Sequence, residues 1–197
     1  MTLSMSQPIQ RAHCNGQPDV KAPQHVTAER LLLRRPTQSD ASLIFARYAS
    51  DPAVTRYLSW PRHQSIEQTY EFLSFSDSEW EAWPAGPYLI ESRHSGLLLG
   101  STGFKFSGPG EAETGYVLAG DAWHQGYATE ALLALMTLCE PLGIRLAWAW
   151  CHHEHVASQR VLEKCDFQRE QAPMHLLEFP NLGSSARQPV FKYARAF

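Results

Sequence analysis

The pattern of apolar and polar residues predicts that the first half of the chain builds a sheet with a few helices. Three leucines flanked by arginines at 30–35 indicate a first strand, and helical spacing follows over residues 41–48. Three further strands are predicted at 88–92, 97–106 and 111–119, and short turns that contain glycine separate them. Strands joined by tight turns pair in opposite directions, so we expect an antiparallel meander.

Residues 65–80 predict an amphipathic helix ahead of that meander. Ile66, Tyr70 and Leu73 follow the i, i+4, i+7 spacing of one helix face, and Trp80 lies two turns further along the same face. We expect these four side chains to form a buried stripe.

The second half of the chain alternates helices and strands. Residues 126–140 are rich in alanine and leucine, which predicts a helix, and an apolar strand follows at 144–151. A second helix is expected at 156–164, a strand from Phe167, and a last strand at 190–197. Such an alternation implies at least one parallel crossover between strands. The fold class is therefore α/β, with a mixed sheet.

Composition is compatible with a single domain that follows a tail. The chain has 197 residues, of which 44% are hydrophobic, enough to bury a core. Residues 1–25 are polar and carry three prolines, so we expect a disordered tail before a domain at 26–197. No apolar stretch suits a signal peptide or a membrane span, so we expect a cytoplasmic protein without membrane contact. The net charge of -3 argues against nucleic acid as a partner.

The cysteines and histidines do not form a recognisable metal motif. No two of the four cysteines make a CxxC pair, so we expect Cys139, Cys151 and Cys165 to be small buried side chains with free thiols. The run HHEH at 152–155 departs from HExxH, and adjacent histidines at the end of a strand rarely focus on one ion. We therefore expect no metal.

A strand-to-helix loop at 119–126 carries the first chemical signal. Gly126 and the small Ala128 stand where the helix begins, and free backbone amides with little side-chain bulk form an anion site. The loop has no lysine, so peptide dipoles would meet most of a phosphate charge. The Walker pattern GxxxxGKS/T and the Rossmann pattern GxGxxG do not occur here. The alternative is an ordinary turn that needs a small residue.

The second signal is a polar strand end that leads directly into a helix, at 150–167. The C-terminal ends of strands beside a crossover are where α/β sheets bind ligands. Ser158 lies in the first turn of the helix, where its hydroxyl can serve a reacting sulfur. A capping or surface serine is the alternative.

Together the two segments resemble the GNAT acyltransferase superfamily, and within it the branch of the ribosomal-protein N-terminal acetyltransferases. The strongest matches are GYVL at 115–118, WHQGYATEA at 123–131 and HHEHVASQRVLEKCDF at 152–167. Further similar segments are RLLLR at 30–34, DPAVTRYL at 51–58 and GSTG at 100–103. The resemblance covers about residues 27–197.

The resemblance implies the GNAT fold, a mixed and mostly antiparallel sheet that is splayed between its fourth and fifth strands and flanked by helices. Acetyl-CoA would lie in the splay as co-substrate, and its pantetheine arm would pair with the backbone of Val117 and Leu118. Its pyrophosphate would bind the backbone amides of Gln125, Gly126, Tyr127, Ala128 and Thr129. His155 would contact the pantetheine arm or the helix start.

Three positions depart from the family pattern. His124 stands where the family often has glycine, His155 replaces an asparagine, and Asp166 replaces the glycine before Phe167. His155 can still donate or accept a hydrogen bond. Asp166 is expected to alter only a turn.

Acetyl transfer to an amine needs a proton acceptor, a polarised carbonyl and a proton donor for the leaving thiolate. Glu113 lies near the start of the strand that faces the co-substrate, so it is the candidate base, with a solvated strand residue as the alternative. Ser158 is the candidate proton donor, and a backbone N–H near Leu118 is the candidate group to polarise the carbonyl.

We therefore expect an N-acetyltransferase that moves an acetyl group from acetyl-CoA to a primary amine, either a protein N-terminus or a small amine, by direct attack in a ternary complex. The alternatives are a non-catalytic GNAT-fold module that binds CoA or a partner, and a nucleotide-binding protein of another fold. Aromatic residues and an excess of carboxylates over residues 55–83 favour a cationic acceptor over an acidic one. The assembly is expected to be a monomer or a homodimer.

Overall fold

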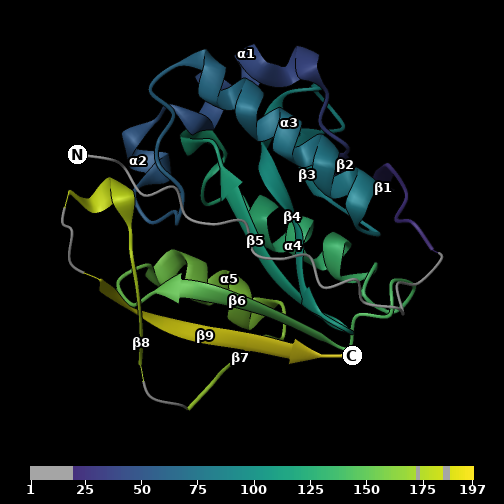
Figure 1. Ribbon diagram of the computed structural model, residues 1–197, viewed down its shortest axis with the longest axis vertical. Coiled ribbons are helices and arrows are strands. Elements are labelled where there is room, and N and C mark those ends of the chain that lie inside the picture. Colours follow the sequence, from purple (N-terminus) through teal and green to yellow (C-terminus); the bar gives the residue numbers. More distant parts are fainter. Residues whose placement is uncertain (1–19, 172–173, 184–186) are drawn as a thin grey trace, which may run out of the picture.

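The computed structural model describes residues 20–171, 174–183 and 187–197. Within these ranges the chain forms one nine-stranded sheet with helices on both faces (Figure 1). The strands are β1 (His25–Thr27), β2 (Leu31–Arg34), β3 (Pro87–Ser92), β4 (Leu98–Gly108), β5 (Glu111–Leu118), β6 (Leu146–His152), β7 (Gln168–Arg169), β8 (His175–Leu177) and β9 (Gln188–Ala196).

The α-helices of the described ranges connect these strands and cover the sheet. They are α1 (Ala41–Ile44), α2 (Pro52–Thr55), α3 (Ile66–Ala82), α4 (Tyr127–Met136) and α5 (Val156–Lys164). The helix predicted at 126–140 is shorter than expected, because turns replace it after Met136. None of these helices is long and apolar enough to cross a lipid bilayer.

The buried face of α3 agrees with the predicted stripe except at one position. Its buried positions are Thr69, Leu73, Ser76 and Trp80. The prediction is confirmed for Leu73 and Trp80 but is wrong for Tyr70, whose side chain is 44% exposed. Thr69 is satisfied in the interior because its hydroxyl lies 2.8 Å from Nδ1 of His63. A small bonded hydroxyl therefore takes the interior position that the apolar spacing had given to tyrosine.

The sheet is open between β5 and β6. The strand order is β1-β2-β3-β4-β5-β6-β9-β7, with β8 paired to β9, and β3, β4 and β5 form the predicted antiparallel meander. β5 and β6 are the fourth and fifth strands of the sequence-based prediction. They run parallel but pair only at 111–113 with 146–148, and then diverge (Figure 1). The predicted splay is confirmed.

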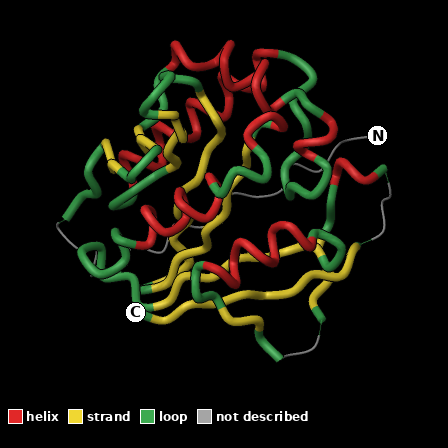
Figure 2. The backbone as a smooth tube through the Cα atoms, turned by 180° about the vertical axis from the view of Figure 1, so that it is seen from behind, coloured by secondary structure: helices red, strands yellow, loops and turns green. Residues whose placement is uncertain are grey.

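Two clusters of apolar side chains cover the two faces of the sheet. On one face, Val117 of β5 packs in a cluster with Ile44 of α1 and Leu73 of α3. On the other face, Leu118 packs in a cluster with Leu132 of α4. Seen from behind, α4 and α5 lie in front of the strands (Figure 2). Consecutive residues of β5 therefore pack against helices on opposite faces of the sheet.

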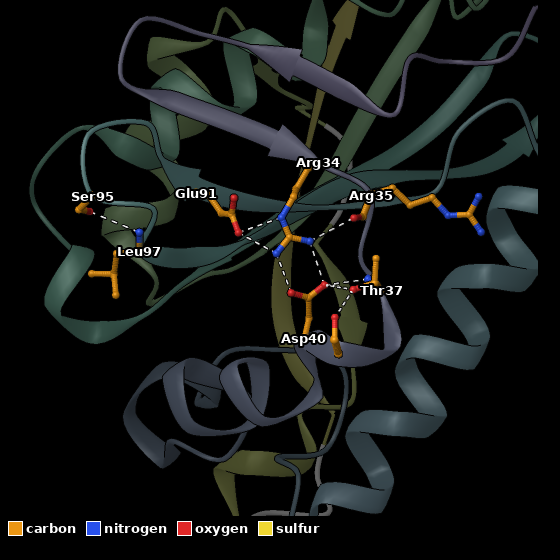
Figure 3. Close-up of polar contacts among 8 residues, drawn as sticks. Arg34, Arg35, Thr37, Asp40, Glu91, Ser95 and Leu97 are labelled. Atoms are coloured by element: carbon orange, nitrogen blue, oxygen red, sulfur yellow. Dashed lines mark hydrogen bonds and ion pairs between the residues drawn. The ribbon is translucent and has the colours of Figure 1, made fainter.

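An ion-pair network centred on Arg34 joins β2 to β3 and to the turn before α1 (Figure 3). The guanidinium donates to both oxygens of Asp40, at 2.8 and 2.6 Å, and to Glu91 at 2.8 Å. Asp40 also accepts from the amide and the hydroxyl of Thr37. Burial acts to raise the pKa of Asp40, but the hydrogen bonds from Arg34 and Thr37 prevail and hold that pKa below its ordinary value. The buried carboxylate thus stays charged and paired.

Most of the predicted tail, residues 1–25, lies outside the described residues. From residue 20 onward the chain contacts the domain: Lys21 donates to the carbonyls of Trp80 and Trp83 at the end of α3. Ala22 is buried, and its amide donates to the carbonyl of Pro84. The contacts of the domain therefore begin ahead of residue 26.

The described cysteines are free and buried, as the sequence predicts. Burial raises the pKa of Cys139 to about 12 and that of Cys151 and Cys165 to about 11 each. These thiols stay protonated near neutral pH and serve as small core side chains.

Candidate active site

A cleft of about 490 Å³ occupies the gap between β5 and β6. Residues 113–117 of β5, residues 149–152 of β6 and Ser158 of α5 line it. We call it the β5–β6 cleft. An aromatic wall adds Tyr57, Trp60, Phe72, Phe75 and Phe179. The incomplete pairing of the two strands therefore creates the space in which backbone, hydroxyl and carboxylate groups meet.

Helix α5 places Ser158 against Tyr116 of β5. The phenolic oxygen of Tyr116 lies 2.9 Å from Oγ of Ser158 and 3.3 Å from its carbonyl oxygen. Burial raises the pKa of Tyr116, while the hydrogen bond from Ser158 acts to lower it, so the phenol keeps its proton at neutral pH. Two linked hydroxyls can pass a proton into the cleft.

Sequence reasoning selected Ser158 and missed Tyr116 as a functional side chain. The available signal was the position of Tyr116 within GYVL, on the strand that faces the cleft. The partner of its hydroxyl is 42 residues away, on a helix that follows another strand. That contact becomes visible only once β5 and β6 stand side by side.

Glu113 lines the cleft from the opposite face of β5. The ladder with β4 is regular here: Glu113 pairs with Lys105 and Tyr116 with Thr102. Because side chains alternate along a strand, those of Glu113 and Tyr116 point to opposite faces of the sheet. Burial raises the pKa of Glu113, although Lys105 acts to lower it. A carboxylate with a raised pKa is a better proton acceptor near neutral pH.

Two glycines form the floor of the cleft on the face of Glu113. Gly103 of β4 and Gly115 of β5 are directly opposite in the ladder, and both line the cleft. A Cβ atom built on Gly115 would have no other atom within 4 Å. The floor is therefore open at this point, and its space is available to a ligand.

The start of α4 presents unbonded backbone amides. Gly126 is the N-cap residue and has φ +80°, a left-handed conformation that glycine adopts without steric cost. The amides of Tyr127, Ala128 and Thr129 open the helix, and no hydrogen bond engages them from the described part of the chain. Together with Gln125 they present a helix start whose free amides have the arrangement that suits an anion.

The end of β5 offers one backbone N–H to the gap. The amide of Ala119 donates to the carbonyl of Leu99 on β4 at 2.8 Å. Strand residues direct their amides alternately to either side, so the amide of Leu118 faces β6 and the backbone of Val117 faces β4. The carbonyl of Leu118 already accepts a bond from Nε1 of Trp123 at 2.9 Å. The N–H of Leu118 is thus one backbone group available to a ligand in the splay.

Comparison with known families decides the class of protein. The family model described as "Acetyltransferase (GNAT) domain" matches residues 30–168, which run from the start of β2 into β7 and include both Tyr116 and Ser158. The chain belongs to the GNAT acetyltransferase family. It is therefore an acyltransferase, and the expectation drawn from its motifs is confirmed.

Relatives of this GNAT acetyltransferase include two bacterial sequences that bear the name of uncharacterized N-acetyltransferases. YoaA of Bacillus subtilis (strain 168) is 31% identical over 145 residues, which cover 72% of this chain and 81% of the relative. The protein p20 of Bacillus licheniformis is 28% identical over 145 residues, with the same coverage.

Solved structures share the fold of this GNAT chain. A GNAT-family acetyltransferase from Bacillus anthracis has a TM-score of 0.74 at 24% identity, over 87% of this chain and 98% of the other. RimL, a ribosomal L7/L12 alpha-N-protein acetyltransferase in complex with coenzyme A, has a TM-score of 0.77 at 24% identity, over 88% and 98%. At these identities the comparison establishes a common architecture.

In this GNAT domain His152 and His155 pack against an aromatic ring. Both imidazoles stack on Tyr57, at ring-centroid distances of 4.7 and 4.8 Å. Nδ1 of His152 accepts the amide of Glu154 at 3.2 Å, which leaves the imidazole proton on Nε2. Burial lowers the pKa of both histidines, so they are neutral at pH 7. The described residues hold no cluster of three or more histidine, cysteine or acidic side chains that could bind a metal ion.

Two departures from the GNAT pattern fall where the backbone is left-handed. His124 has φ +60° and Asp166 has φ +62°, a region that glycine enters freely and other residues rarely. After α5, the amide of Asp166 donates to Glu163 and that of Phe167 to Leu162, which is the Schellman pattern of a helix end. The backbone thus keeps a conformation suited to glycine, at a steric cost of about 1–2 kcal/mol per residue.

Proposed function

We propose that this GNAT acetyltransferase transfers the acetyl group of acetyl-CoA to a primary amine by direct attack within a ternary complex. The observation that carries the proposal is the β5–β6 cleft, which unites a carboxylate, two linked hydroxyls and an open strand edge. RimL, which shares this architecture, is an alpha-N-protein acetyltransferase in complex with coenzyme A.

The backbone groups at the end of β5 and at the start of α4 fit coenzyme A. The amides of 127–129 are without hydrogen bonds from the described residues, and they follow a glycine that leaves the approach unobstructed. The N–H of Leu118 on the open edge of β5 suits an extended amide-containing arm, since such an arm can pair as an added strand. When bound, acetyl-CoA supplies an activated thioester. His155, the N-cap residue of α5, lines the same cleft.

The reaction needs two proton transfers, one from the amine and one to the sulfur, and they take place on opposite faces of β5. Glu113 accepts the proton of the attacking amine, because its raised pKa suits a base near neutral pH. Ser158, hydrogen-bonded to Tyr116, donates a proton to the departing sulfur, and the phenol replenishes it. The N–H of Leu118 polarises the thioester carbonyl. The strand separates acid from base, so the two do not neutralise each other directly.

The charged and aromatic residues that line the cleft suit a cationic acceptor. The carboxylates Glu79 and Glu113 line it, and Lys105 is the one lysine or arginine among its described lining residues. Trp60 also lines the cleft and adds an aromatic surface of the kind that attracts cations. The acceptor is therefore a peptide N-terminus or a small cationic amine, and an acidic amine such as glutamate is disfavoured.

An amine panel tests this function. Purified protein is incubated with acetyl-CoA and one amine at a time: a dipeptide amide with uncharged side chains, a polyamine, a neutral amino acid or glutamate. The release of free thiol is measured against time. We expect release with the peptide or the polyamine and little with glutamate. Glutamate as the fastest acceptor would overturn the acceptor assignment. Tight CoA binding without thiol release from any amine would favour a non-catalytic CoA-binding module.

A further inference from the structure

Arg30 lies against the loop that leads into α4, residues 119–126, although 95 residues separate it from Gln125. It stands in the turn between β1 and β2. Its Nη1 donates to the carbonyl of Gln125 at 3.0 Å, and its guanidinium lies over the ring of Tyr127, 4.6 Å from the centroid. Its Nη2 is 3.4 Å from the point where a Cβ atom on Gly126 would lie. One arginine thus contacts Gln125 and Tyr127 and lies beside Gly126 between them.

Glu130 of α4 fixes the orientation of this arginine. Oε2 of Glu130 accepts from Nε of Arg30 at 2.7 Å, and Oε1 accepts from its backbone amide at 2.6 Å. The carboxylate therefore engages the inner edge of the guanidinium. Nη2 makes no hydrogen bond to the described residues and faces Gly126, while the side chain as a whole is 46% exposed. The free edge of the cation is directed to the loop and to solvent.

The turn that carries Arg30 is itself held in place. Arg93 donates from Nη1 to the carbonyls of Ala28 and Glu29, and its amide donates to the carbonyl of Arg30, each at 2.9 Å. The amide of Ala28 donates to Leu31 at 2.9 Å. The cation therefore stands on a rigid support, so little conformational entropy is lost when it binds an anion.

We propose that Arg30 is a positioning residue for the pyrophosphate of coenzyme A, an inference that rests on the proposed acetyl-CoA function. It holds the loop in its anion-binding conformation through Gln125 and Tyr127. It also supplies the positive charge that the loop itself lacks, since residues 119–129 contain neither lysine nor arginine. A cation beside unbonded amides strengthens binding of a phosphate beyond what peptide dipoles provide.

The test compares ligands with and without the pyrophosphate. Dissociation constants of CoA and of pantetheine are measured by calorimetry for the wild type, Arg30→Gln and Arg30→Lys, at low and at high salt. We expect Arg30→Gln to weaken CoA binding by about tenfold, to leave pantetheine within about twofold, and to flatten the salt dependence of CoA binding. Arg30→Lys should restore part of both the affinity and the salt dependence.

Arg47→Gln is the matched control. Arg47 pairs with Asp121 at the other end of the same loop region, at 2.8 and 2.7 Å, and does not contact residues 125–127. It should leave CoA affinity within about twofold. If folded Arg30→Gln loses equal affinity for CoA and pantetheine, or loses no affinity for either, the proposed role of Arg30 is overturned. The proposed function of the protein would still stand. A wild-type protein that binds no CoA at millimolar concentration would overturn this role and the proposed function together.

Discussion

Glu113 and Tyr116 lie three residues apart on β5 and direct their side chains to opposite faces of the sheet. The carboxylate faces the side of α1 and α3, and the phenol faces Ser158 on α5. Both line the β5–β6 cleft: Glu113 is the last residue of β5 that pairs with β6, opposite Trp148, and Tyr116 lies beyond it, where the two strands have separated. The candidate base on one face of β5 and the hydroxyl pair of Tyr116 and Ser158 on the other therefore line the same cleft.

Removal of the Ser158 hydroxyl should lower turnover more than CoA affinity. If Ser158 donates the proton, Ser158→Ala loses about 10²–10⁴-fold in kcat, or only about tenfold if water takes its place. Tyr116→Phe should act in the same direction, and the double variant should be less than additive because the two hydroxyls form one unit. Thiol release gives kcat, and calorimetry gives the CoA affinity. Wild-type turnover of Ser158→Ala from mildly acidic to mildly alkaline pH would remove Ser158 from the mechanism.

The pH dependence of turnover should report Glu113. Its folded-state pKa is raised by burial, and the base works only when ionised, so kcat/KM should fall as the pH drops through a pKa above the ordinary 4.5. Glu113→Gln should abolish that limb and lower the rate at neutral pH by about 10²–10⁴-fold. The measurement is a pH–rate profile for both proteins. An acidic limb that persists unchanged in Glu113→Gln would assign it to another group.

A side chain at position 126 should obstruct the helix-start amides. Gly126→Val should weaken CoA binding by about tenfold or more, about 1.4 kcal/mol, because the Cβ meets Arg30 and crowds the anion approach. Since φ is +80°, valine also strains the backbone, so Gly126→Ala serves as the milder variant and melting of the free protein shows whether each is folded. Unaltered CoA affinity in both folded variants would exclude this loop as the phosphate site.

A side chain at position 115 should fill the part of the cleft next to Glu113, where the proposed acceptor amine would bind, without disturbing the fold. The space next to Gly115 is open to 4 Å, so Gly115→Leu should keep the melting temperature within a few degrees. Thiol release with the best acceptor of the panel should fall strongly, while CoA affinity stays within about twofold, which calorimetry checks. Gly115→Ala, with one added carbon, should retain most of the activity. Equal activity of the leucine variant would place the acceptor elsewhere.

Glycine at position 166 should stabilise the protein. Asp166 has φ +62° at the end of α5, so Asp166→Gly relieves a steric cost of about 1–2 kcal/mol against an entropic cost of about 0.5–1 kcal/mol. The melting temperature should rise by a few degrees at most. Lys164→Gly, in the last turn of the same helix, is the control and should lower the melting temperature. A lower melting temperature for Asp166→Gly would mean that its side chain contributes more than its strained backbone costs.

Local patterns in the sequence were sufficient for the order of strands and helices. Consecutive strand segments joined by short turns that contain glycine indicated β3, β4 and β5 as a meander, and the small residues Gly126 and Ala128 indicated a helix that opens with free amides. The stripe of α3 was misassigned at Tyr70, because apolar spacing cannot anticipate that Thr69 finds a hydrogen-bond partner in the interior. Side-chain burial depends on such partners, and these come from distant segments.

The sequence by itself determined the family motifs, the α/β order and the residue types of the site. These rest on short-range periodicity and on the conformational limits of glycine and proline, which need only neighbouring residues. Only the tertiary structure decided that Tyr116 meets Ser158 and that Arg30 meets the loop before α4. Each contact joins segments that are far apart along the chain, and the packing of helices on a splayed sheet fixes which of them lie within hydrogen-bonding distance.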